Sequence, residues 1–240
     1  MDTDFIYTYS PLIPGILKKR YKRFLADIEL ESGEIITAHC ANTGPMIGVC
    51  DTHSRVYISK SNNPKRKLAY SWELIEVENT WVGINTFLPN RVIKQVLEQE
   101  KFPPLQGQYN QVRPEVPYGK NKKSRIDFLL RNESEKNPIY LEVKNTTLAK
   151  DNTALFPDTV TTRGQKHLQE LMDLLPDAQP MMLYFINRGD CDRFSPADDY
   201  DADYGKLFRE AVEKGVKILP CRFEITPQGI RYLGLAELVL

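Results

Sequence analysis

The hydrophobic pattern changes at Asn85, and this change divides the chain into two parts with different folds. Before Asn85, apolar and polar residues alternate over short stretches, which predicts half-buried β-strands. Segments rich in Gly, Pro and Asn separate the predicted strands, which are residues 15–20, 24–30, 35–39, 55–59 and 68–77. Short strands without a helix favour a small antiparallel β-barrel for residues 1–84. We expect an OB-like barrel, with an SH3-like barrel as the alternative.

After Asn85, stretches with helical spacing alternate with strands. Apolar residues on one face of 92–97 predict a helix that Asn90 can cap. The elements expected next are strands at 109–118, 124–130 and 138–145, a helix at 161–175, a strand at 181–186, a helix at 200–214 and a strand at 216–223. This order predicts an α/β domain over residues 85–240, with a mixed central sheet flanked by helices.

The strands of this second part carry a group of charged residues. Asp127 lies in one predicted strand, and Glu142 and Lys144 lie in the next. Because side chains alternate along a strand, Glu142 and Lys144 project from the same face, and Asp127 can face them from its neighbour. Burying these charges among apolar residues is costly unless they pair with each other or bind a cation.

Two converging carboxylates offer the oxygen ligands that Mg²⁺ and Mn²⁺ prefer. Lys144 could orient or deprotonate an attacking water, or stabilise negative charge that develops on a phosphate. The spacing of Asp127, Glu142 and Lys144 resembles the site of PD-(D/E)xK nucleases. A solvated strand face or an internal salt bridge is the alternative interpretation of the same residues.

The net charge is zero, but its distribution points to an anionic polymer as a partner. Residues 1–125 hold 18 Lys and Arg against 13 Asp and Glu, and the rest of the chain has the opposite imbalance. The basic residues form three clusters, at 18–23, 65–67 and 120–125. A single cluster is usually a solvated edge, whereas three in one half make nucleic acid a serious candidate. The residues expected to contact DNA here are Lys18, Lys19, Arg20, Lys22, Arg23, Lys65, Arg66, Lys67 and Arg125.

The predicted helix at 161–175 starts with a run of polar residues that could also contact phosphate. Free N–H groups at a helix N-terminus bind anions, and Arg163, Lys166 and His167 would add charged donors. The alternative is that Asp158 or Thr162 is an ordinary helix cap and that His167 is a core histidine.

The composition and the absence of targeting motifs in the sequence indicate where the protein is located. Its 240 residues are 41% hydrophobic and 27% charged, as in soluble globular proteins. The longest dense apolar run, residues 181–186, is too short to span a bilayer. Asp2 and Asp4 stand where a secretory signal would be basic, and no Cys-x-x-Cys pair occurs. We therefore expect a cytoplasmic protein with four reduced cysteines.

Several long strings resemble the sugar fermentation stimulation protein A (SfsA) family over essentially the whole chain. They are GILKKRYKRFLAD at 15–27, AHCANTGPM at 38–46, SNNPKRKL at 61–68, SRIDFLL at 124–130, FPD at 156–158 and TRGQKHL at 162–168. The resemblance implies an N-terminal OB-like domain, a C-terminal domain similar to PD-(D/E)xK nucleases, DNA binding and a regulatory role in sugar utilisation. By position it implies a site of Asp127, Glu142 and Lys144, with Glu115 and Asp158 as supporting carboxylates.

Two functions follow as competing expectations. The first is a DNA-binding protein whose Mg²⁺ or Mn²⁺ site hydrolyses phosphodiesters, with binding largely independent of DNA sequence and weakened by salt. The second is a non-catalytic DNA-binding regulator that retains only the nuclease fold. A third, less specific expectation is a structural charge cluster in a protein that acts through other proteins. The sequence is compatible with a monomer or a homodimer.

Overall fold

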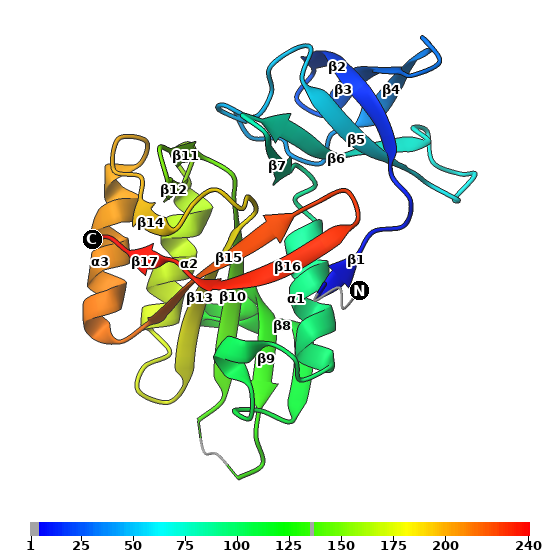
Figure 1. Cartoon of the computed structure of the whole chain (residues 1–240). Helices are drawn as coiled ribbons and strands as arrows, with labels where there is room; N and C mark the ends of the chain where they lie inside the picture. The colour runs from blue at the N-terminus through cyan, green and yellow to red at the C-terminus, as the bar shows by residue number, and fades with distance from the viewer. Residues whose placement is uncertain (1–4, 135–136) are drawn as a thin grey trace.

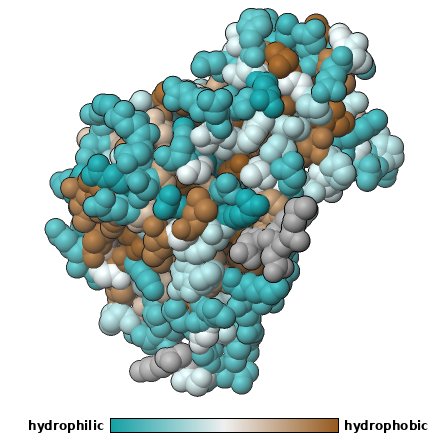
Figure 2. Space-filling model, in the orientation of Figure 1, coloured by the Kyte–Doolittle hydropathy of each residue, from teal (hydrophilic) through white to brown (hydrophobic). Residues whose placement is uncertain are grey.

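The chain forms two lobes, as the computed structural model shows for residues 5–134 and 137–240 (Figure 1). Asp2 and Asp4 therefore lie outside the described residues. Figure 2 shows hydrophilic residues over much of one face of both lobes, interrupted by smaller apolar patches. Within the described ranges, no helix is both long and apolar enough to cross a membrane. All four cysteines are free thiols, and Cys50 is the one that is not fully buried.

The smaller lobe is a closed β-barrel. Its sheet has the order β4-β3-β2-β5-β6-β7, and parallel pairing of β4 with β6 closes it. Buried side chains such as Leu17, Ile58 and Trp72 fill the interior. The strands are β2 (Ile13–Tyr21), β3 (Leu25–Leu30), β4 (Ile35–His39), β5 (Arg55–Lys60), β6 (Tyr70–Val77) and β7 (Thr80–Gly83). The five strands β2 to β6, closed by the parallel pair, agree with the expected OB-like barrel.

The larger lobe contains a seven-stranded mixed sheet with the order β1-β16-β15-β13-β10-β9-β8. The central pairs β10–β13 and β13–β15 are parallel, and the outer pairs are antiparallel. This confirms the predicted mixed sheet. The strands are β1 (Tyr7–Thr8), β8 (Gln111–Tyr118), β9 (Ser124–Arg131), β10 (Ile139–Thr146), β13 (Gln179–Ile186), β15 (Lys217–Ile225) and β16 (Gly229–Leu235).

Helices cover both faces of this sheet. Helix α1 (Leu88–Glu98) packs on one face, with Val92 and Ile93 in a core shared with Leu141 and Val143 of β10. Helices α2 (Thr162–Met172) and α3 (Ala202–Lys214) pack on the other face. Because residues alternate along β10, Glu142 and Lys144 point away from α1, toward the side of α2. Two 3-10 turns, η1 (Pro103–Leu105) and η2 (Lys120–Lys122), lie in the connections.

A second, smaller sheet in this lobe was not predicted. It has the order β11-β12-β14-β17, formed by β11 (Ala149–Lys150), β12 (Thr153–Phe156), β14 (Arg193–Pro196) and β17 (Glu237–Leu238). Strands of two to four residues are too short to show a period in the sequence.

Two further features differ from the sequence-based expectations. Strand β1 pairs with β16 in the larger lobe, so Tyr7 and Thr8 do not belong to the barrel that was predicted to begin at residue 1. Helix α1 begins at Leu88, after the N-cap residue Phe87, so Asn90 does not cap it. Pro89 in the first turn favours this earlier start because its missing N–H has no partner to lose there.

The two lobes are joined by hydrogen bonds that include buried groups. The Gly83 N–H donates to the carbonyl of Asn187 at 2.9 Å, and the Asn187 side-chain amide donates to the carbonyl of Gly83 at 3.1 Å. The fully buried Asn187 side chain fills the space that a side chain at position 83 would need. The Thr86 hydroxyl also donates to the carbonyl of Ala41 in the barrel. These contacts fix the segment between the barrel and α1.

Candidate functional site

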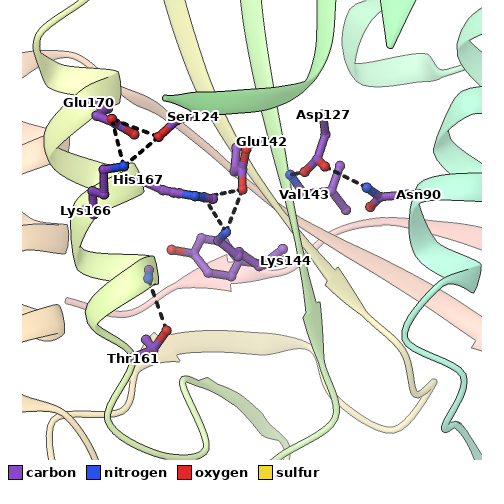
Figure 3. Close-up of polar contacts among 12 residues, drawn as sticks. Asn90, Ser124, Asp127, Glu142, Val143, Lys144, Thr161, Lys166, His167 and Glu170 are labelled. Atoms are coloured by element: carbon purple, nitrogen blue, oxygen red, sulfur yellow. Dashed lines mark hydrogen bonds and ion pairs between the residues drawn. The ribbon is translucent and has the colours of Figure 1, made fainter. Parts of the chain in front are cut away.

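Asp127 occupies a gap where two strands separate. The antiparallel register of β9 and β10 ends at the pair Phe128 and Leu141. Beyond this pair, the Val143 N–H donates to Asp127 Oδ2 at 2.7 Å instead of to a backbone carbonyl of β9. Asn90 of α1 donates its side-chain amide to Asp127 Oδ1, also at 2.7 Å (Figure 3). The strand ladder and α1 therefore fix both oxygens of this carboxylate.

Glu142 lies beside Asp127 and accepts two donors on a single oxygen. The Lys144 ammonium donates to Glu142 Oε1 at 2.7 Å, and His167 Nδ1 of α2 lies 2.5 Å from the same oxygen (Figure 3). Lys144 Nζ is also 3.0 Å from His167 Nδ1. Since Nδ1 cannot both donate and accept, the short contact with a carboxylate assigns the proton to Nδ1, donating to Glu142. His167 is 4% exposed, so it supports Glu142 from inside the fold, although it still lines the cavity beside Glu142.

The environment shifts the pKa values of the two carboxyl groups in opposite directions. Burial, assisted by the nearby Glu142 charge, raises the pKa of Asp127 to about 7, against the lowering effects of the Val143 N–H, Lys144 and Asn90. Burial alone would also raise the pKa of Glu142, but Lys144 and His167 outweigh it and hold that pKa below its ordinary value. Glu142 is thus stably ionised, whereas at Asp127 burial outweighs the nearby Lys144 and the two hydrogen-bond donors.

Glu142 Oε2 is buried and has no hydrogen-bond partner among the described residues. A carboxylate oxygen without a partner is costly in a protein interior, and a cation or an ordered water can satisfy it. The cavity that Glu142 lines measures about 350 Å³ and is also lined by Asp127, Lys144, Glu115 and Arg163. In the described ranges, no three His, Cys, Asp or Glu side chains converge closely enough to enclose a metal ion alone. The cavity thus suits an ion that keeps several waters and binds one or two carboxylates, as Mg²⁺ does.

Glu115 reaches this cavity from the edge strand β8. The register pairs Pro114 with Phe128 and Val116 with Ile126, which places Glu115 opposite Asp127. Its φ of 54° is in the left-handed region, which is costly for a residue with a side chain inside a strand. The structure thus brings the predicted supporting carboxylate Glu115 to the same cavity as Asp127 and Glu142.

Asp158, the other predicted supporting carboxylate, lies elsewhere. It lines a separate cavity of about 100 Å³ together with Asn42 and Gly44 of the barrel and Thr146. Burial raises the pKa of Asp158, and the backbone N–H groups of Asp158 and Met46 lower it in part. The structure therefore brings Asp158 to the contact between the lobes and not to Asp127 and Glu142.

The basic residues around α2 form a groove next to the carboxylate cavity. A second cavity, of about 550 Å³, shares Glu115, Arg163 and His167 with the first. Its other lining residues include Lys123, Arg125 and Lys166. The Lys166 ammonium donates to Ser124 Oγ at 2.9 Å and lies 3.4 Å from the Glu170 carboxylate. Arg163 is exposed. Positive charge thus extends from the carboxylate cavity along α2.

The predicted basic residues of the barrel separate into two groups. Arg20 donates to the carbonyls of Arg23, Asn42 and Gly44, and Arg23 donates to the carbonyl of Thr43. Lys18 pairs with Glu29, and Arg66 donates to Ser71. These side chains therefore have structural contacts. The exposed ammonium groups among the predicted residues are Lys19, Lys22, Lys65 and Lys67.

This division gives a stability prediction. Arg20→Ala is expected to lower the free energy of unfolding by about 1–3 kcal/mol, because carbonyls of the 42–44 loop lose a charged donor. Lys22→Ala, which removes an exposed charge from the same cluster, is expected to change it by less than about 0.5 kcal/mol. Urea unfolding of both variants checks this. Equal effects would show that Arg20 is a surface residue like Lys22.

The raised pKa of Asp127 gives a pH prediction for the metal-free protein. The folded state binds this proton more tightly than the unfolded state, so the contribution to stability is complete below the ordinary pKa of 3.8 and is lost as the pH rises through about 7. At about 1.4 kcal/mol per pKa unit, the whole loss is about 4 kcal/mol, of which roughly 3 kcal/mol falls between pH 5 and pH 8. Urea unfolding at pH 5 and pH 8 with a chelator should show a steeper decline for the wild type than for Asp127→Asn. Identical declines would contradict the assignment.

Sequence reasoning missed the role of Asn90 and did not identify the partner of His167. Asn90 fits a cap equally well by sequence, and only the tertiary packing of α1 against β9 brings its amide to Asp127. The spacing of His167 on α2 allowed a core position, and the structure shows its partner to be Glu142.

Family models match both parts of the chain. The SfsA N-terminal OB domain matches residues 19–84, and the sugar fermentation stimulation protein RE domain matches residues 87–229. The chain belongs to the SfsA family. Similar proteins called "Sugar fermentation stimulation protein homolog" include one from Crocosphaera subtropica, 85% identical over 99% of both chains. Another, from Synechocystis sp., is 65% identical over 99% of this chain and 100% of the relative.

A solved structure of the SfsA family shares the fold along the whole chain. The structure of Pyrococcus furiosus SfsA in complex with Ca²⁺ matches with a TM-score of 0.87 and 26% identity, covering 99% of this chain and 100% of that one. The barrel and the mixed-sheet domain are thus shared by proteins of low sequence identity.

Proposed function

We propose that this SfsA-family protein binds DNA and that the cavity lined by Asp127, Glu142 and Lys144 holds a divalent cation for phosphodiester hydrolysis. The observation that carries the proposal is the buried, unpartnered Glu142 Oε2, which lines the same cavity as the Asp127 carboxylate. A cation bound there would satisfy this oxygen and offset the repulsion between the two carboxylates.

Each residue of the cavity has a proposed task. Asp127 and Glu142 would hold Mg²⁺ or Mn²⁺, with Glu115 at the rim. The bound ion would supply Lewis-acid chemistry and an activated water. Lys144 would stabilise negative charge on the phosphate or orient the water, and His167 would keep Glu142 in position. The Ca²⁺ named for the Pyrococcus furiosus protein supports a divalent cation in this family, since Ca²⁺ and Mg²⁺ both prefer oxygen ligands.

The substrate is proposed from the charge around the cavity. Arg125, Arg163 and Lys166 line the adjoining groove, where they can neutralise phosphates on either side of the reacting one. Contacts of this kind do not read bases, so binding is expected to be largely independent of sequence. The exposed lysines of the barrel would extend the contact. A DNA substrate also fits the cytoplasmic location that we propose.

A non-catalytic DNA-binding regulator of sugar utilisation is the second candidate. It is favoured by the position of Lys144, whose ammonium donates to Glu142 at 2.7 Å, so that part of its positive charge is already neutralised within the protein. If this pair persists with DNA and a cation present, the site would be structural.

Incubation with single-stranded, duplex and branched DNA in Mg²⁺ or Mn²⁺ distinguishes these candidates. We expect cleavage by the wild type, lost in both Asp127→Ala and Lys144→Ala, and binding that weakens as salt is raised. Binding without cleavage in either metal would support the regulator. Cleavage that survives both substitutions would refute the proposed site.

A further inference from the structure

Phe87 places an exposed aromatic ring at the edge of the carboxylate cavity. Phe87 is 64% exposed, although the next two residues, Leu88 and Pro89, are buried. It lines the same cavity as Asp127, Glu142 and Lys144. The packing of α1 does not require this ring, since the buried face of the helix is formed by other residues. Because this aromatic ring lines the cavity and is exposed, it is available to a ligand that enters the cavity.

The backbone that carries Phe87 is firmly held. The Phe87 N–H donates to Asn85 Oδ1 at 3.1 Å, and the buried Asn85 amide donates to Glu73 Oε2 in the barrel at 2.8 Å. Glu73 in turn accepts from the Ser59 hydroxyl at 2.6 Å. The neighbouring Thr86 is bonded to Ala41. A ring presented from a fixed backbone loses little conformational entropy when a ligand stacks on it.

The charges near the ring indicate the chemistry of that ligand. Arg163 lines the cavity with Phe87 and also belongs to the basic groove with Arg125 and Lys166. A ligand that follows both cavities must therefore combine anionic groups with a flat apolar face. Nucleic acid combines phosphates with flat bases, and bases stack on aromatic side chains whatever their sequence. In a duplex both faces of a base are already stacked, so only an unpaired base or a terminal base can cover the ring.

We infer that Phe87 forms a subsite for an unpaired nucleobase, and that the site takes single-stranded DNA in preference to duplex. This inference rests on the proposed function, because it places the base next to the phosphate that the carboxylate cavity would receive. The strand would run from the basic groove beside α2, past Lys144, to the ring of Phe87. Phe87 is then a specificity-determining residue that acts by stacking and takes no part in proton transfer.

The test measures binding of the full chain to a short fluorescein-labelled oligothymidylate by anisotropy, with Ca²⁺ present and Mg²⁺ and Mn²⁺ absent. A blunt duplex of mixed sequence, labelled in the same way, is the comparison probe. We expect the wild type to bind the single strand more tightly. Phe87→Ala should weaken single-strand binding roughly 5- to 150-fold and change duplex binding by less than about twofold.

Two further variants make the result specific to an aromatic ring. Phe87→Trp should retain the single-strand preference, which also shows that position 87 tolerates substitution. Leu235→Ala removes another exposed apolar side chain, on β16, and should leave both affinities unchanged. If the wild type binds the single strand and Phe87→Ala binds it equally well, the subsite is refuted while the proposed function stands. If the wild type binds neither probe, the proposed DNA binding fails together with the subsite.

Discussion

Glu142→Gln is expected to lower the rate of cation-dependent DNA cleavage by roughly 100- to 1,000-fold. Glutamine has nearly the same shape and can still accept from Lys144 or His167 through its carbonyl oxygen. It lacks the negative charge and replaces one carboxylate oxygen with an amide nitrogen, which a divalent cation does not bind. Losing one of two anionic ligands removes several kcal/mol of charge stabilisation, and about 1.4 kcal/mol corresponds to tenfold in rate. Single-turnover cleavage in Mg²⁺ or Mn²⁺ measures the effect.

Glu170→Gln is the matched control for this substitution. Glu170 is also largely buried on α2 and accepts from Ser124 at 2.9 Å, but it does not line the carboxylate cavity. We expect Glu170→Gln to cleave DNA at a rate within a few-fold of that of the wild type. Equal losses in the two variants would indicate a general effect of removing a buried charge and would argue against a cation on Glu142.

Trp72→Ala is expected to lower the free energy of unfolding by about 3–5 kcal/mol. Trp72 is fully buried in the barrel, and its indole N–H donates to the carbonyl of Leu74 at 2.9 Å. Removing the ring leaves a cavity that neighbouring strands of a closed barrel can fill only in part, and it leaves that carbonyl without its donor. Urea unfolding followed by far-UV circular dichroism measures the loss.

Trp81, the second tryptophan of the chain, provides the comparison. It is partly exposed, with its ring 4.9 Å from that of Tyr57 and with Arg55 stacked over it at 5.5 Å. Trp81→Ala should cost less than half as much as Trp72→Ala, because part of the ring is already in water. A larger loss for Trp81 would show that the interior of the barrel lies elsewhere.

The regular elements of the fold could be predicted because each shows its own period. Alternation at residues 24–30 predicted β3, and the helix expected at 161–175 is α2, which ends at Met172. Alternation alone did not identify the inward face at the strand's start, since Phe24 is 45% exposed. The pairing of Tyr7 with Ile230 could not be predicted, because a strand of two residues has no period and its partner is more than 200 residues away.

The candidate site was predictable where it depends on neighbouring strands and not where it depends on distant packing. Two-residue spacing places Glu142 and Lys144 on one face, and their side chains indeed meet at 2.7 Å. Asp127 comes next to them because β9 and β10 are adjacent. The contact of Asn90 with Asp127 and the position of Asp158 against the barrel loop depend on how helices and lobes pack, which local spacing does not encode.

Anomalous diffraction from crystals of the full chain soaked in Mn²⁺ tests the central claim most directly. We predict one strong anomalous difference peak within coordination distance of Asp127 and of Glu142 Oε2, absent from crystals of Asp127→Ala treated in the same way. A well-ordered cavity that contains only water at high Mn²⁺ concentration, or a peak bound by other side chains alone, would contradict the account.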